Sequence, residues 1–216
     1  MDFERARTNM VECQIMPNGV TNHDVLRAFL NVPREAFVPS AQRPHAYIDE
    51  DIEVAPGRYV MEAMTMAKLV QLCGLEPTSI VLDIGCATGY STAILAQLSA
   101  SVVALEEDES LAAQASEHLI EADITNAAVV TGPLNKGYAQ EAPYDVIFLN
   151  GAVDVLPDTL GEQLKDGGRM VVVYGQGNAA QARLLTRHGD RLGRTNAFNC
   201  AVEPLPGFQQ EAAFVF

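Results

Sequence analysis

The sequence contains no tryptophan and few basic residues. Lysine and arginine number 14 together, against 28 aspartate and glutamate residues, which gives a formal net charge of -14 over 216 residues. Proteins bind nucleic acids with lysine and arginine side chains that neutralise phosphates, and they bind anionic membranes with the same residues. We therefore expect neither nucleic acid nor a membrane among the partners of this protein.

Long apolar runs and closely spaced cysteines are also missing. No stretch approaches the roughly 20 apolar residues that cross a bilayer, and the first residues lack the basic and apolar parts of a secretory signal. The 4 cysteines are far apart, which predicts neither a zinc knuckle nor a redox pair. The 4 histidines are equally scattered, so no metal site is predicted. We expect a cytoplasmic protein with reduced thiols.

The pattern of the chain changes near residue 78. Before it, we expect helices over residues 1–31 and 61–75, with a loop over residues 38–60 that is rich in proline. After it, apolar β-branched segments alternate with helical ones. The predicted strands are 79–84, 102–106, 127–130, 144–149 and 169–174, and the predicted helices are 91–98, 109–120, 156–164 and 179–187. Two last segments, 195–202 and 211–216, are expected to pair as an antiparallel hairpin.

This alternation predicts an α/β protein with a doubly wound, mostly parallel sheet that ends in an antiparallel hairpin. We expect one compact unit. Residues 78–216 would form the Rossmann-like core, and residues 1–77 would supply N-terminal helices and a substrate loop.

A glycine-containing turn ends the first predicted strand. Its residues are Asp83-Ile-Gly-Cys-Ala-Thr-Gly89. Ligands of doubly wound sheets bind beyond the carboxyl ends of the strands, and Gly85 and Gly89 would let the backbone turn tightly and a ligand approach closely. Glu106 ends the next strand, where its two carboxylate oxygens can accept both hydroxyls of a ribose. The turn and the carboxylate together predict a site for a ribose-containing cofactor.

Two cofactors compete for such a turn. A nicotinamide dinucleotide is bound by the pattern G-x-G-x-x-G, whereas this chain has Ala87 at the middle glycine and the spacing G-x-x-x-G. Asp83 would repel a pyrophosphate, but a carboxylate suits the cationic methionine end of S-adenosylmethionine. The charge of Asp83 therefore favours S-adenosylmethionine.

The segment Leu82-Asp-Ile-Gly-Cys-Ala-Thr-Gly-Tyr-Ser-Thr-Ala-Ile-Leu95 resembles the cofactor motif of the protein-L-isoaspartate O-methyltransferases. Further similar segments are Val32-Pro-Arg-Glu-Ala-Phe-Val38, Ala142-Pro-Tyr-Asp-Val-Ile147, Leu164-Lys-Asp-Gly-Gly-Arg-Met-Val171 and Pro204-Leu205. The resemblance implies a class I S-adenosylmethionine-dependent methyltransferase with an N-terminal helical extension. Its implied role is protein repair, by methylation of isoaspartyl residues in proteins or peptides. The cofactor contacts that it implies are Asp83, Gly85, Cys86, Gly89, Glu106, Glu107, Pro133 and Leu134.

Two segments depart from the family pattern. The family has a Thr-Ile-Ser-like segment at the methyl-transfer site, whereas residues 55–61 are Ala-Pro-Gly-Arg-Tyr-Val-Met, which is shorter and contains neither serine nor threonine. The family's Gly-Asp-Gly, whose Asp contacts the adenine amino group, is here Gly-Pro133-Leu134, so we expect adenine to pack on Leu134.

In the departing loop we predict that Arg58 pairs with an anionic group of the substrate and that Tyr59 lines the methyl-transfer site. A solvated arginine and a packing tyrosine are the alternative. Two other functions stay open at this point. One is a methyltransferase of the same descent that acts on a small carboxylate or a hydroxylated metabolite, and the other is a cofactor-binding protein without catalysis.

Overall fold

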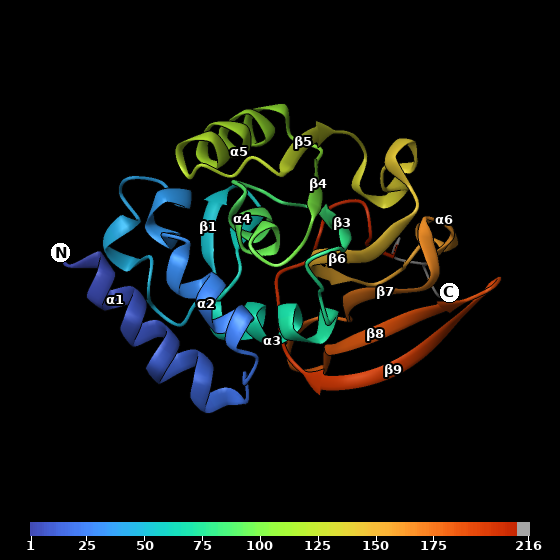
Figure 1. Cartoon of the computed structure of the whole chain (residues 1–216), viewed down its shortest axis with the longest axis horizontal. Coiled ribbons are helices and arrows are strands. Elements are labelled where there is room, and N and C mark those ends of the chain that lie inside the picture. The colour runs from blue at the N-terminus through green and yellow to red at the C-terminus, as the bar shows by residue number, and fades with distance from the viewer. Residues whose placement is uncertain (211–216) are drawn as a thin grey trace, which may run out of the picture.

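The computed structural model describes residues 1–210, with every side chain except that of Asn178. Its main sheet consists of β3 (Ile80–Ile84), β4 (Ser101–Glu106), β5 (Ala127–Thr131), β6 (Tyr144–Val153), β7 (Leu164–Tyr174), β8 (Gln181–His188) and β9 (Arg191–Asn199). The strand order is β5-β4-β3-β6-β7-β8-β9 (Figure 1). The neighbouring strands from β5 through β4, β3 and β6 to β7 pair in parallel. Strand β8 pairs antiparallel with both β7 and β9. The predicted doubly wound sheet with an antiparallel edge is confirmed.

The α-helices are α1 (Phe3–Asn9), α2 (His23–Asn31), α3 (Ala63–Cys73), α4 (Tyr90–Ala96), α5 (Glu109–Glu121) and α6 (Asp158–Glu162). A π-helix spans Met10–Ile15, and short 3-10 helices span Met16–Asn18, Arg34–Phe37, Arg43–His45, Leu134–Lys136, Ala139–Glu141 and Gly177–Ala179. Local side chains fix several boundaries. Asn22 and Asp108 accept hydrogen bonds from the first backbone N–H groups of α2 and α5, and Gly74 ends α3 in the left-handed conformation. No helix of the described residues has the length and hydropathy of a bilayer-spanning segment.

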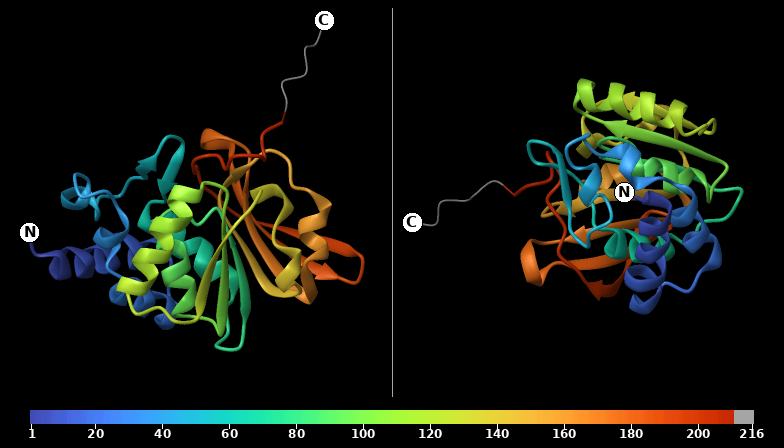
Figure 2. Two further views of the ribbon diagram at one scale, coloured as in Figure 1. Left: turned by 90° about the horizontal axis from the view of Figure 1, so that it is seen from above. Right: turned by 90° about the vertical axis from the view of Figure 1, so that its left-hand side faces the viewer.

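The sheet separates two apolar cores, because alternate residues of a strand point to opposite faces. In β3, Val81 belongs to the core shared with the N-terminal helices, whereas Leu82 and Ile84 belong to the core on the other face. The view from above shows α4, α5 and the N-terminal helices on one side of the sheet and the short α6 on the other (Figure 2). Asp83 therefore shares the face of Val81, toward α4.

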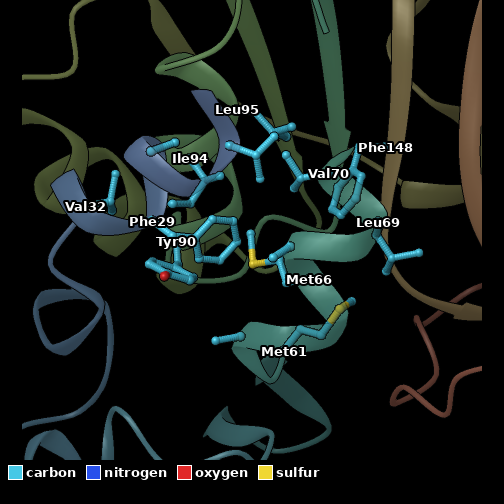
Figure 3. Packing of buried hydrophobic residues seen from close by; sticks show 14 of the residues in the cluster. Phe29, Val32, Met61, Met66, Leu69, Val70, Tyr90, Ile94, Leu95 and Phe148 are labelled. Atoms are coloured by element: carbon cyan, nitrogen blue, oxygen red, sulfur yellow. The ribbon is translucent and has the colours of Figure 1, made fainter. Parts of the chain in front are cut away.

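The N-terminal residues pack into the first of these cores. Phe29 of α2 and Met66 of α3 lie beside Tyr90, the first residue of α4, and the rings of Phe29 and Tyr90 meet edge to face at 6.3 Å (Figure 3). Because Tyr90 follows Gly89 directly, this packing fixes the end of the glycine turn. Residues 1–77 thus share one core with the sheet, and the proposed boundary at residue 77 stays a prediction.

The expected loop over residues 38–60 is wrong in part. Its second half forms a two-stranded antiparallel sheet of β1 (Ile52–Ala55) and β2 (Arg58–Val60), joined by Pro56 and Gly57. The strands have four and three residues, too few for a periodic pattern to stand out from the surrounding prolines.

The expected helix over residues 179–187 is also wrong. Alanine and leucine favour helices in this segment, but β7 leaves an unpaired edge, and residues 181–188 pair with it as β8. Both faces of β8 are buried, since Ala182 joins one core and Leu185 the other. The antiparallel hairpin exists, but β8 and β9 form it. The predicted strand over residues 211–216 lies outside the described residues.

Candidate active site

The glycine turn follows β3, which lies between β4 and β6 in the sheet. The strand order reverses at this point, because the chain runs from β3 outward to β4 and β5 on one side and then continues with β6 on the other. Gly85 and Gly89 have φ of 80° and 93°, a region that suits glycine. A Cβ on Gly85 would lie 2.5 Å from Leu205 Cδ2 and 3.6 Å from Leu134 Cδ1. The backbone at Gly85 therefore forms the floor of a cradle whose walls are apolar side chains.

Asp83 lies beneath this turn and is completely buried. Its Oδ2 accepts hydrogen bonds from the hydroxyls of Ser91 and Thr92 on α4, each at 2.7 Å. Burial raises the pKa of Asp83 to about 6, although the two hydroxyls act in the opposite direction. Within the described residues its Oδ1 has no hydrogen-bond partner. Asp83 is thus a buried acid with one free acceptor.

Glu106 ends β4 beside the turn and is also completely buried. The backbone N–H of Ala87 donates to its Oε2 at 2.8 Å, and those of Glu107 and Asp108 donate to its Oε1 at 2.9 and 3.2 Å. These three donors fix the orientation of the carboxylate from below.

Arg58 occupies the other side of the same carboxylate. Its Nη1 donates to Glu106 Oε1, and its Nη2 donates to Oε2 at 2.6 Å, so that the pair is bidentate. The guanidinium also lies over the turn, with Nη2 3.4 Å from the position of a Cβ on Gly85. Arg58 is 6% exposed. The alternative that Arg58 is exposed to solvent is therefore wrong. The predicted pairing of Arg58 with an anionic group of the substrate stays a prediction.

The β1–β2 hairpin explains why Arg58 points inward and Tyr59 does not. Neighbouring residues of a strand face opposite sides, and Val60 and Ile52, which pair across the hairpin, are buried. Arg58 shares the face of Val60, whereas Tyr59 pairs with the exposed Glu53 on the other face and is half-buried. The predicted role of Tyr59 at the methyl-transfer site stays a prediction.

A hollow of about 20 Å³ is lined in part by Arg58. Its lining residues include Arg58, Tyr59, Asp51, Asn150, Glu203 and Leu205. Asn150 Nδ2 donates to the carbonyl of Gly85 at 3.1 Å and to Ser91 Oγ at 3.2 Å, so this amide ties the turn to α4 and β6.

Asn150 and Leu205 are candidate site residues that the sequence reasoning missed. Asn150 directly follows the predicted strand 144–149, and the rule that ligands lie beyond carboxyl ends of strands was a signal for it. For Leu205 the signal was the Pro204-Leu205 segment that resembles the family, but its place at the site follows from pairing with β6, where the Leu205 N–H donates to the carbonyl of Ala152 at 2.8 Å.

The remaining predicted cofactor contacts occupy different depths. Cys86 and Leu134 are buried, and Leu134 forms one wall of the cradle over Gly85. Glu107 and Pro133 are exposed at the ends of β4 and β5. The structure thus brings Asp83, Gly85, Glu106 and Leu134 together around the turn, with Glu107 and Pro133 at its rim.

These residues fit S-adenosylmethionine in their chemistry. A carboxylate with fixed orientation suits a vicinal diol, the cradle over Gly85 has no space for a side chain, and Asp83 offers a free acceptor toward a cationic group. The carboxylate of Glu106 is engaged by Arg58, so a diol that binds there takes the place of the guanidinium.

The strand order, the turn on β3 and the acid on β4 define a class I methyltransferase. The model of the family "Protein-L-isoaspartate(D-aspartate) O-methyltransferase (PCMT)" matches residues 6–205. The chain belongs to this family, which confirms the sequence prediction. The family comprises S-adenosylmethionine-dependent methyltransferases, in agreement with the predicted enzyme class and cofactor.

Sequence relatives support the same assignment. The chain is 34% identical over 207 residues to the protein-L-isoaspartate O-methyltransferase of Koribacter versatilis (strain Ellin345), covering 96% of this chain and 93% of the relative. It is 34% identical over 205 residues to that of Herpetosiphon aurantiacus, covering 95% and 92%.

Solved structures agree with the fold. A protein-L-isoaspartate O-methyltransferase superposes with a TM-score of 0.80 at 26% identity, over 93% of this chain and 66% of that longer chain. A putative protein-L-isoaspartate O-methyltransferase from Plasmodium falciparum, in complex with S-adenosyl-L-homocysteine, superposes with a TM-score of 0.76 at 18% identity, over 95% and 98%. The class I methyltransferase fold is thereby confirmed.

Proposed function

We propose that this protein is an S-adenosylmethionine-dependent O-methyltransferase that esterifies the free α-carboxylate of isoaspartyl residues in proteins or peptides, as a step of protein repair. The observation that carries the proposal is the family match over residues 6–205, together with a buried carboxylate, Glu106, beside the glycine turn. Glu106 would hold the ribose hydroxyls, Leu134 would pack on adenine, and Asp83 would face the methionine ammonium.

When bound, S-adenosylmethionine supplies a methyl group on a positively charged sulfur. The acceptor carboxylate is already ionised near pH 7, so this chain has no proton to remove and needs no general base. Its residues act by position: Arg58 would pair with the carboxylate, and Tyr59 would line the point of transfer. In the transfer, a C–O bond to the acceptor carboxylate would form as the S–CH₃ bond breaks, and the products would be a methyl ester and S-adenosylhomocysteine.

A small carboxylate is the second candidate substrate. Arg58 lines the hollow, and its guanidinium would pair with the carboxylate of a small molecule as well as with that of a peptide. We propose the cytoplasm as its location, since all four cysteines are free thiols, and we propose no nucleic acid as substrate because the net charge is -14.

The test is methylation of an isoaspartyl peptide. The protein is incubated with S-adenosylmethionine and either that peptide or the same peptide with normal aspartate, and mass spectrometry follows the methyl ester and S-adenosylhomocysteine. We expect ester on the isoaspartyl peptide alone. Glu106→Ala should lower this activity at least about a hundredfold, because it removes the ribose acceptor. If cofactor binds and no isoaspartyl ester forms, the substrate assignment fails.

A further inference from the structure

The bidentate pair of Arg58 and Glu106 resembles the interaction expected with the cofactor. A guanidinium presents two parallel N–H donors to a carboxylate, and a vicinal diol presents two O–H donors. We propose that Arg58 has two successive partners: it holds Glu106 until a ribose displaces it, and the released guanidinium then binds the carboxylate of the methyl acceptor. The cofactor would therefore bind before the acceptor. This inference rests on the proposed function.

Glu106 cannot hold both partners at once. Its two oxygens offer about four lone-pair directions. Five N–H donors already point at them, three from the backbone of Ala87, Glu107 and Asp108 and two from Arg58. The backbone donors are fixed by the fold, and the two from Arg58 are the ones that a side-chain movement can remove. A ribose that reaches the carboxylate from the cradle must therefore replace the guanidinium.

The charges around the hollow explain why the released Arg58 would receive the acceptor. Asp51 and Glu203 also line the hollow, and their carboxylates repel an anionic substrate while the guanidinium is paired with Glu106. Asp51 is held in place, since its Oδ1 accepts the N–H of Glu62 at 2.6 Å. Arg58 lines the same hollow, so its guanidinium, once released from Glu106, is available there to pair with the acceptor carboxylate.

The hairpin allows such a movement of the side chain. Its base is anchored in the core by Ile52 and Val60, which are 4% and 3% exposed. Its tip, Pro56 and Gly57, is exposed, and nothing lies within 4 Å of a Cβ built on Gly57. The Gly57 N–H at this tip donates to Glu53 Oε1 at 3.2 Å. The proposed exchange therefore requires only that the Arg58 side chain turns away from Glu106 while the hairpin stays packed.

Titration calorimetry with S-adenosylhomocysteine tests the competition without turnover. Arg58→Met keeps a long apolar side chain and removes the competing cation, so it should bind S-adenosylhomocysteine about tenfold more tightly than the parent protein. Arg58→Lys, which makes a weaker pair with the carboxylate, should fall between the two. Arg27→Met removes an exposed arginine that pairs with Asp24, and it should leave the affinity unchanged.

The same measurements with an isoaspartyl peptide test the second partner. The parent protein should bind the peptide only after S-adenosylhomocysteine is present, and Arg58→Met should bind it weakly in both cases. If Arg58→Met binds S-adenosylhomocysteine no more tightly than the parent, the exchange is overturned while the proposed function stands. If neither the parent nor Arg58→Lys binds S-adenosylhomocysteine, the exchange and the proposed function both fail.

Discussion

The glycine turn after β3 and the β1–β2 hairpin meet at one ion pair but are built in different ways. The turn lies between central strands of a seven-stranded sheet, and its acids, Asp83 and Glu106, are buried and held by several donors. The hairpin has two short strands, an exposed tip and a buried base. Its link to the turn is the side chain of Arg58.

This difference separates two parts of the enzyme's task. A cofactor site gains from rigid preorganised groups, because their orientation costs nothing at the moment of binding. A substrate site that must admit large and varied chains needs a part that moves. In this chain the exposed tip of the hairpin, Pro56 and Gly57, is the candidate for such a part, whereas Arg58, Val60 and Met61 are buried.

The largest effect should come from the charge buried beneath the turn. Burial raises the pKa of Asp83 in the folded protein to about 6, above its ordinary value of 3.8. The protonated acid therefore favours the folded state at low pH, and this stabilisation is lost as the pH rises through about 6. The free energy of unfolding of the parent, minus that of Asp83→Asn, should therefore fall by about 2 kcal/mol between pH 4 and pH 7.

Urea unfolding of both proteins at each pH measures this difference, and the subtraction removes the titration of other groups. Gln114→Ala, which removes an exposed, uncharged side chain of α5, serves as the control, because it takes no ionisable group away. A difference for Asp83→Asn that stays constant with pH would contradict the assignment of a raised pKa.

An intermediate effect should appear when a methyl group is added to each region. Gly85 and Gly57 both have positive φ, of 80° and 69°, but only on Gly85 would a Cβ meet neighbours, at 2.5 Å from Leu205. Gly85→Ala should lower the free energy of unfolding by about 2 kcal/mol, through backbone strain and overpacking. Gly57→Ala should cost about 1 kcal/mol from strain alone.

Denaturant unfolding of the two variants gives the comparison directly, and calorimetry should show weaker S-adenosylhomocysteine binding for Gly85→Ala alone. Equal costs for the two substitutions would mean that the turn is no more tightly packed than the hairpin tip.

The smallest effect should come from Ala87, the turn residue that stands where a dinucleotide fingerprint has glycine. Its φ of 49° is strained for a residue with a side chain. Ala87→Gly should raise the free energy of unfolding by about 0.5 kcal/mol, since the relieved strain exceeds the added flexibility of the unfolded chain. Thermal unfolding measures it, and a loss of more than 1 kcal/mol would show that the Ala87 methyl group contributes packing that outweighs the strain.

Elements with strong local signals were predicted well, and those decided by distant partners were not. Strands β3 to β7 are apolar runs bounded by turns, so their existence and order in the chain were readable. Residues 181–188 contain helix-forming alanine and leucine, and only the open edge of β7 makes them a strand. The three- and four-residue strands of the hairpin carry too little periodicity to detect.

The sequence by itself determined the glycine turn, the acids Asp83 and Glu106 at the ends of their strands, and the family. These are local features, because each follows from residues adjacent in the chain. Only the tertiary structure decided that Arg58 pairs with Glu106, 48 residues away, and that Leu205 closes the cradle over Gly85. Both contacts depend on how separate elements pack together, because the interactions that fix them join residues with no relation in sequence.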